Sequence, residues 1–160
     1  MFGNTHASSL QAGDIAPQFS LPDHTGTQRS LEEFQGKWLV LYFYPKNDTP
    51  GCTKEACSFR DEYKVIVEQN TQVVGISIDN SDSHAEFAAK YGLPFPLLAD
   101  TKGEVAKMYQ ALTSLGPVKY AKRNSFIIDP SGHIQKIYRK VDVNHHSKEI
   151  ISALRELQQQ

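Results

Sequence analysis

The stretch WLVLYFYPKNDTPGCTKEAC, residues 38–57, decides the fold. Its first seven residues are apolar or aromatic without a break, which indicates a strand covered on both faces. A short polar loop follows, and Thr49 and Pro50 then have the residue types of a helix N-cap and a first helical position. Both cysteines of the chain, Cys52 and Cys57, fall in this second half. The stretch therefore predicts a central strand, a loop and a helix that begins beside a cysteine.

An apolar stripe extends the predicted helix beyond the quoted stretch. Its members are spaced by four, three, four and three positions, which is the period of one helix face. They are Cys52, Ala56, Phe59, Tyr63 and Ile66. The pattern predicts one helix over residues 50–66.

The flanking sequence alternates between strand and helix signals. Strands are predicted at 18–22, 73–78, 96–100, 126–128 and 134–138, the last two joined by the turn DPSGH. Helices are predicted at 30–34 with a cap at Ser30, at 81–91 with a cap at Ser81 or Ser83 and an end at Gly92, at 104–109 and at 146–157. This order predicts an α/β fold of thioredoxin-like type, with a mixed central sheet, helices on both faces and an N-terminal hairpin extension.

Size and charge narrow the classes of function. The length of 160 residues predicts one domain, at 13–160, after a flexible tail at 1–12. A net charge of −1 argues against nucleic acid or an anionic membrane surface as partner. No apolar run approaches the roughly 18 residues of a membrane span. The N-terminus has neither a basic start nor an apolar segment of signal-peptide type, so a cytoplasmic location is expected.

Cys52 is placed where a cysteine can be reactive. The first turn of a helix has free backbone N–H groups and the positive end of the helix dipole, and both favour thiolate over thiol. The site also follows the end of a central strand, where α/β sheets place their ligands. The alternative is that Cys52 is a small core residue, because it continues the apolar stripe.

Cys57 lies about 140° round the helix from Cys52, on a more polar flank. It is either functional or an uninvolved flanking residue. Five residues of helix separate the two Cα atoms by roughly 8.7 Å, beyond the roughly 7 Å limit for a disulfide. A bridge would require the first turns to unwind. The spacing is neither C-x-x-C nor a zinc pattern, and the pair His145-His146 is expected to be solvated rather than metal-binding.

Three segments together resemble the peroxiredoxins, and within them the bacterioferritin-comigratory or Q group. YPKNDTPGCTKEACSFRDEY, from Tyr44, resembles the family's active-site segment, in which P-x-x-x-T/S-x-x-C is matched by Pro45, Thr49 and Cys52. GDIAPQFSLPDHTG resembles the opening hairpin, and RNSFIIDPSGHI resembles the late hairpin with its arginine, Arg123. The resemblance covers almost the whole chain from Gly13.

The resemblance implies a thiol peroxidase that reduces hydrogen peroxide and organic hydroperoxides. Cys52 would be the peroxidatic nucleophile and would become a sulfenic acid. Thr49 would place its hydroxyl beside the sulfur, or alternatively only cap the helix. Pro45 would shield the sulfur from water, or only end the strand. Gly51 and Cys52 would offer backbone N–H groups to the peroxide.

Two charged residues complete the implied site. Arg123 would stabilise the developing negative charge, and alternatively is a solvated surface residue. Thioredoxin-like topology favours the first role, because the first strand of the late hairpin runs antiparallel to the central strand and so begins where that strand ends. Glu55 would orient Arg123, or would be an ordinary acidic residue of a first helical turn.

The same resemblance implies the rest of the cycle. Cys57 matches the resolving position, so it would form an intramolecular disulfide with Cys52 that thioredoxin or a similar dithiol reduces. No cofactor or metal is implied, and a monomer is expected. Two rival hypotheses remain at this point: a thiol–disulfide oxidoreductase acting on proteins, and a non-enzymatic thioredoxin-fold module.

Overall fold

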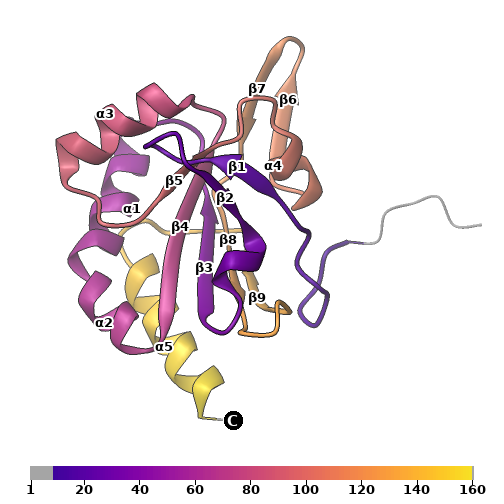
Figure 1. Ribbon diagram of the computed structural model, residues 1–160, viewed down its shortest axis with the longest axis vertical. Coiled ribbons are helices and arrows are strands. Elements are labelled where there is room, and N and C mark those ends of the chain that lie inside the picture. Colours follow the sequence, from indigo (N-terminus) through magenta and orange to yellow (C-terminus); the bar gives the residue numbers. More distant parts are fainter. Residues whose placement is uncertain (1–8, 160) are drawn as a thin grey trace, which may run out of the picture.

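The computed structural model describes residues 9–159. Its centre is a five-stranded mixed sheet in the order β5-β4-β3-β8-β9 (Figure 1). These strands are β3 (Trp38–Phe43), β4 (Thr71–Ser77), β5 (Leu97–Ala99), β8 (Asn124–Ile128) and β9 (Ile134–Tyr138). Strands β3, β4 and β5 are parallel, whereas β8 runs antiparallel to both β3 and β9. The predicted mixed sheet is confirmed.

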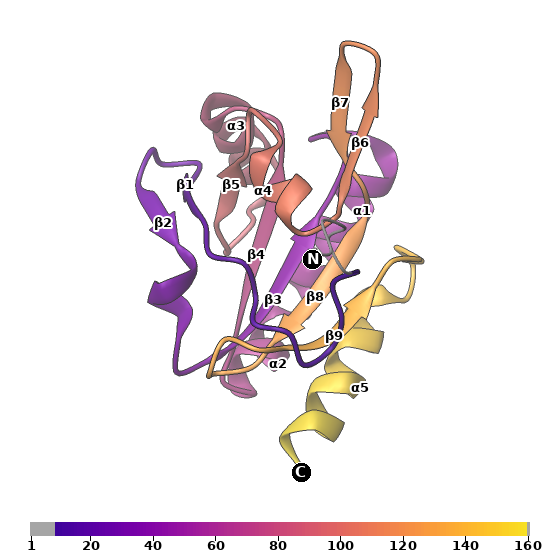
Figure 2. The ribbon, with the colours of Figure 1, turned by 90° about the vertical axis from the view of Figure 1, so that its right-hand side faces the viewer.

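Helices cover both faces of this sheet, as Figures 1 and 2 show. One face packs against α1 (Pro50–Asp61), α2 (Tyr63–Glu68), α3 (Ser81–Tyr91) and α5 (His146–Gln158). The other face packs against the N-terminal segment, the 3-10 helix η1 (Leu31–Phe34) and α4 (Glu104–Met108). Alternate residues of β3 pack in the cores on opposite faces of the sheet. Val40 and Tyr42 face the core with α1, and Leu39 and Leu41 face the core with η1. This explains the unbroken apolar run, because neither face of the strand meets water.

Two small hairpins stand outside the central sheet. The N-terminal one, β1 (Ser20–Pro22) with β2 (Gln28–Ser30), confirms the predicted extension. The other, β6 (Leu112–Leu115) with β7 (Val118–Ala121), projects from the molecule in Figure 2 and was not predicted. Its strands are short, and much of it faces solvent. It therefore lacks the alternating apolar pattern by which a half-buried strand is recognised.

Two local predictions need correction. The single helix expected over 50–66 is divided at Glu62, whose ψ of 7° is not helical. Phe59 and Ile66 nevertheless pack in the same core. Helix α3 is capped by Asn80, whose side chain accepts from the N–H of Ser83 at 2.8 Å, and by neither serine. An Asn is as good a cap as Ser, so the sequence allowed several neighbouring starts.

The predicted tail and domain boundary are only partly visible. Residues 1–8 of the tail lie outside the described residues. Leu10 packs against the core that contains η1, and its N–H donates to the side chain of Gln110 at 2.8 Å. Gly13 then donates to the carbonyl of Ile134. Within the described residues, contacts with the folded body are thus already present at Leu10, three residues before Gly13.

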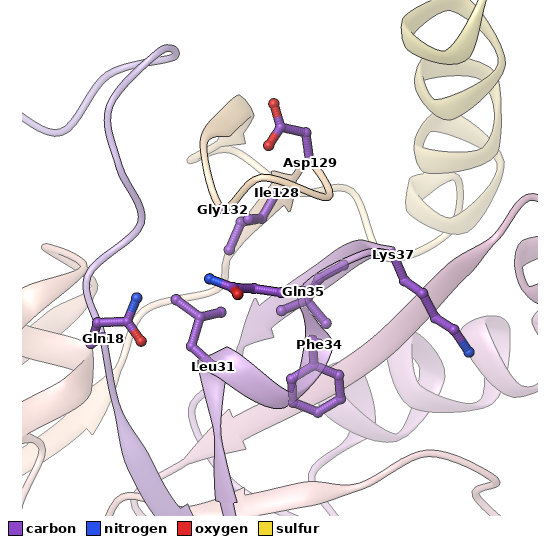
Figure 3. Close-up of a pocket in the computed structure, with 9 residues that line it drawn as sticks. Gln18, Leu31, Phe34, Gln35, Lys37, Ile128, Asp129 and Gly132 are labelled. Carbon is purple, nitrogen blue, oxygen red and sulfur yellow. The ribbon is translucent and has the colours of Figure 1, made fainter.

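The hollow beside the start of β3 is too small for a ligand. It is lined by Gln18, Leu31, Phe34, Gln35, Lys37, Leu39, Ile128, Asp129 and Gly132 (Figure 3). Its volume is about 10 Å³, no more than about one water molecule requires. Cys52 lies at the other end, beyond the last residue of β3. Of the part of the chain described, no helix is both long and apolar enough to cross a lipid bilayer.

Candidate active site

Helix α1 begins as the sequence predicts, but Thr49 does not cap it with its side chain. Thr49 has the extended backbone of an N-cap (φ −95°, ψ 154°), and its carbonyl accepts from the N–H of Thr53. Its hydroxyl instead donates to the carbonyl of Lys46 at 2.8 Å. That bond ties the loop to the helix start. Pro50 then occupies the first helical position, which puts Cys52 in the first turn.

Cys52 is buried against an arginine. The residue is 1% exposed, and Nη2 of Arg123 donates to its Sγ at 3.3 Å. A Cβ on Gly51 would come within 3.1 Å of the same Nη2. Glycine at this position therefore leaves room for the guanidinium beside the sulfur. The sequence alternatives of core residue and reactive cysteine are not exclusive, since Cys52 packs in the core and still has a charged partner.

Sheet topology places Arg123 at the cysteine. Strand β8 pairs antiparallel with β3 so that Asn124 lies opposite Phe43, the last residue of β3. The residue before Asn124 therefore lies where the chain leaves β3 for the loop and α1. The side chain of Arg123 is only 23% exposed, so it is not a solvated surface residue. Burial opposes its charge, but Glu55 and Cys52 more than offset this and raise the pKa of Arg123.

Glu55 holds the other side of the guanidinium. Nη1 of Arg123 donates to Oε1 of Glu55 at 2.7 Å, and the Glu55 side chain is 1% exposed. Its second oxygen, Oε2, is buried and has no hydrogen-bond partner within residues 9–159. Burial raises the pKa of Glu55 to about 7, although the charge and hydrogen bond of Arg123 act in the opposite direction. Glu55 is thus not an ordinary exposed residue of a first helical turn.

Cys57 lies outside this group but on the same helix. It is half-buried, and both cysteines are free thiols. Because α1 is continuous from Pro50 to Asp61, the roughly 8.7 Å Cα separation of two residues five apart in a helix applies. Cys57 lines a surface groove between α1 and the segment that leads into α5. The other lining residues are Lys54, Ser58, Asp61, Glu62, Val143, Asn144, Ser147 and Lys148.

Pro45 borders a separate hollow beside the site. This hollow of about 490 Å³ is lined by Pro45, Lys46, Ile78, Asp79, Val118, Lys119 and Tyr120. It lies between the loop that leads into α1 and strand β7, and its walls mix apolar side chains with charged ones. The unpredicted hairpin therefore forms one wall of the space next to the cysteine loop.

Sequence reasoning missed a buried polar network behind the same loop. The Tyr44 hydroxyl donates to Oδ1 of Asn47 at 2.6 Å, and Nδ2 of Asn47 lies 3.0 Å from Nδ1 of His84. Nε2 of His84 faces the carbonyl of Leu98 at 2.9 Å, so it carries the proton and Nδ1 accepts. Burial lowers the pKa of His84 to about 4. Asn47 and His84 are 37 residues apart, and nothing in the sequence connects them.

The expectation that His145 and His146 form a solvated pair is wrong for one of them. His145 is exposed and contacts Asp142 at 2.9 Å. His146 is 1% exposed and is hydrogen-bonded through Nε2 to the hydroxyl of Ser125 at 2.8 Å. The first residue of α5 is drawn into the interior because β8 passes beneath it. Within the described residues, no three His, Cys, Asp or Glu side chains gather as a metal site would require.

Fold and site together define a class of protein: a thioredoxin-like domain with a buried cysteine at a helix N-terminus against an arginine. The AhpC/TSA family matches residues 12–137. Peroxiredoxin Q of Sedum lineare chloroplasts is 39% identical over 155 residues, which cover 96% of this chain and 83% of that protein. Peroxiredoxin Bcp of Bacillus subtilis is 36% identical over 153 residues, which cover 93% and 98%.

A solved structure agrees with these relatives. The crystal structure of peroxidoxin BcpB from Mycobacterium tuberculosis superposes with a TM-score of 0.87 at 36% identity, covering 92% of this chain and 97% of that one. The chain therefore belongs to the AhpC/TSA family, and among its members it is a peroxiredoxin, that is, a peroxidase. The resemblance noted in the sequence and the thioredoxin-like fold are both confirmed.

Proposed function

We propose that Cys52 is the peroxidatic residue of this enzyme. The observation that supports this most directly is the 3.3 Å contact between Nη2 of Arg123 and Sγ of Cys52. A permanent positive charge at that distance stabilises a thiolate, which is the nucleophilic form. The sulfur attacks one peroxide oxygen, the O–O bond breaks, and Cys52 becomes a sulfenic acid while water or an alcohol leaves.

The residues around Cys52 have distinct roles in this proposal. Arg123 stabilises the negative charge that spreads over the peroxide as the O–O bond breaks. Glu55 fixes the plane of the guanidinium through the 2.7 Å bond, so that Nη2 faces the sulfur. Gly51 admits the guanidinium and offers its N–H to the peroxide. Pro45 belongs to the loop that leads into α1 and limits the access of water, and Thr49 places its hydroxyl beside the sulfur and the peroxide.

Cys57 is proposed as the resolving residue. Its thiol attacks the Cys52 sulfenic acid, a disulfide forms and water leaves. Because the intact helix holds the two Cα atoms too far apart, residues from about 51 to 57 must unwind first. A dithiol then reduces the disulfide by exchange, and thioredoxin has the required chemistry. We further propose that the enzyme works as a monomer in the cytoplasm, on both hydrogen peroxide and organic hydroperoxides.

A steady-state assay tests the proposal. Peroxide consumption is followed with thioredoxin and its reductase present, for the parent protein and for Cys52→Ser and Cys57→Ser. The parent should turn over, and neither variant should. Insulin reduction is measured in parallel, because a protein-directed thiol–disulfide oxidoreductase would reduce insulin. Full peroxide turnover by Cys52→Ser would refute the assignment of the nucleophile.

A further inference from the structure

Two buried polar atoms at the site have no hydrogen-bond partner. They are Oε2 of Glu55 and the hydroxyl of Tyr42, and the statement holds for residues 9–159. The charges of Glu55, Cys52 and Arg123 act on the Tyr42 hydroxyl, so Tyr42 and Glu55 belong to the same buried group around Cys52. A buried polar atom without a partner is uncommon and calls for an explanation. Orienting Arg123 occupies only Oε1, so it does not explain the free oxygen.

The charges at the site suggest what that oxygen does. Two acidic groups, the Cys52 thiol and the Glu55 carboxyl, share the one guanidinium of Arg123. The other titratable groups that face them are Tyr42 and Tyr44, whose pKa values burial raises well above the usual range, and His146, whose pKa burial lowers. All three are therefore neutral near pH 7. If thiolate and carboxylate were both ionised, one buried negative charge would lack a partner, which is costly.

We propose that Glu55 stores the proton that Cys52 releases and returns it to the oxygen that leaves the peroxide. The inference rests on the proposed role of Cys52. In the first step the thiol proton moves to the carboxylate, which gives a thiolate and a carboxylic acid. The sulfur then forms a bond to one peroxide oxygen, the O–O bond breaks with its electron pair on the other oxygen, and that oxygen takes the proton from Glu55.

Atoms, electrons and charge balance over these reaction steps. Sulfur is oxidised from thiolate to sulfenic acid, the peroxide is reduced to water or an alcohol, and Glu55 ends as a carboxylate. The site has one negative charge before and after the reaction, opposite the one positive charge of Arg123. When a dithiol later restores the Cys52 thiol, its proton can move to Glu55 again. A pKa of about 7 for Glu55 suits a group that must both accept and release a proton near neutrality.

The test compares two peroxides whose leaving groups differ in their need for a proton. Hydrogen peroxide releases hydroxide, which must be protonated, whereas peracetic acid releases acetate, which is stable as an anion. Glu55→Gln retains an oxygen that can accept from Arg123 but has no proton to exchange. Single-turnover oxidation is measured near pH 7 in protein that also has Cys57→Ser. Glu68→Gln, an exposed change on α2, is the matched control.

We expect Glu55→Gln to slow oxidation by hydrogen peroxide by about 10²-fold, the range of general acid catalysis. Oxidation by peracetic acid should slow far less. Because the first step needs Glu55 as a carboxylate, the rate with hydrogen peroxide should rise in the parent as the pH passes about 7, and the pH profile of Glu55→Gln should lack that step. Equal slowing with both peroxides would overturn the proposal, because misplacement of Arg123 affects both. An unchanged rate with hydrogen peroxide would also overturn it and leave the role of Cys52 intact.

A second measurement needs no change at Glu55. The infrared difference spectrum between reduced and peroxide-oxidised Cys57→Ser protein should show the loss of one protonated carboxyl band. A spectrum without a carboxyl change would overturn the proposal even if Glu55→Gln does not fold. Peroxide consumption that survives Cys52→Ser would instead refute the proposed function itself.

Discussion

Glu55→Gln has an effect on stability that follows directly from the structure. Burial raises the pKa of Glu55 from 4.5 to about 7, against the opposing charge of Arg123. Between these pH values the folded protein keeps a proton that the unfolded chain has released. The contribution of Glu55 to the free energy of unfolding is therefore fully present below about pH 4.5 and is lost as the pH rises to about 7. At 1.36 kcal/mol per pKa unit, the loss is about 3 kcal/mol.

The assay is urea unfolding over a pH series, with and without Glu55→Gln, in protein that also has Cys52→Ser so that the thiol does not titrate. Gln binds no proton, so the variant should gain stability relative to its parent as pH rises towards 7, by up to about 3 kcal/mol. His84, whose pKa burial lowers to about 4, makes both proteins less stable as pH falls below about 6.5. That contribution cancels in the difference. A difference that does not change with pH would refute the reasoning.

Four further predictions concern the mechanism and the fold. Cys57→Ser should leave the first oxidation of Cys52 intact and make it prone to sulfinic acid, which mass spectrometry would detect. Arg123→Ala should slow peroxide attack by roughly 10²–10³ with the fold retained; a near-parental second-order rate would contradict its role. In the parent, amides of residues 51–57 should lose hydrogen-exchange protection on oxidation, and equal protection in both states would exclude unwinding. Asn80→Ala should cost about 1 kcal/mol in the free energy of unfolding, as urea titration would show.

The local predictions that were wrong or missing depend on packing and burial, which local sequence signals do not reveal. The sequence near α3 contains several residues that can cap a helix, and only packing selected Asn80. His146 was expected to be solvated because it lies at a helix start beside another histidine. Its neighbour Ser125 is 21 residues away, and no local signal indicates that contact. The hairpin of β6 and β7 was missed because it buries little apolar surface, which is what the pattern detects.

The sequence alone determined the central strand, the helix start and the position of Cys52 in the first helical turn. These depend on local physics: an unbroken apolar run, a proline at the first helical position and free N–H groups beside Cys52. The resemblance added Arg123, Glu55 and Cys57 as candidates. For Arg123 and Glu55 the alternatives were a surface charge and an ordinary acidic residue, and the sequence left them open.

Only the tertiary structure decided between those alternatives. Arg123 meets Cys52 because β8 pairs antiparallel with β3, and strand pairing depends on residues more than 80 positions apart, such as Phe43 and Asn124. Burial then changes the chemistry. Glu55, which in water would be ionised at neutral pH, has a pKa of about 7 because the folded core excludes water from it. Composition and spacing contain neither the pairing nor the exclusion of water, because both arise only when distant segments pack together.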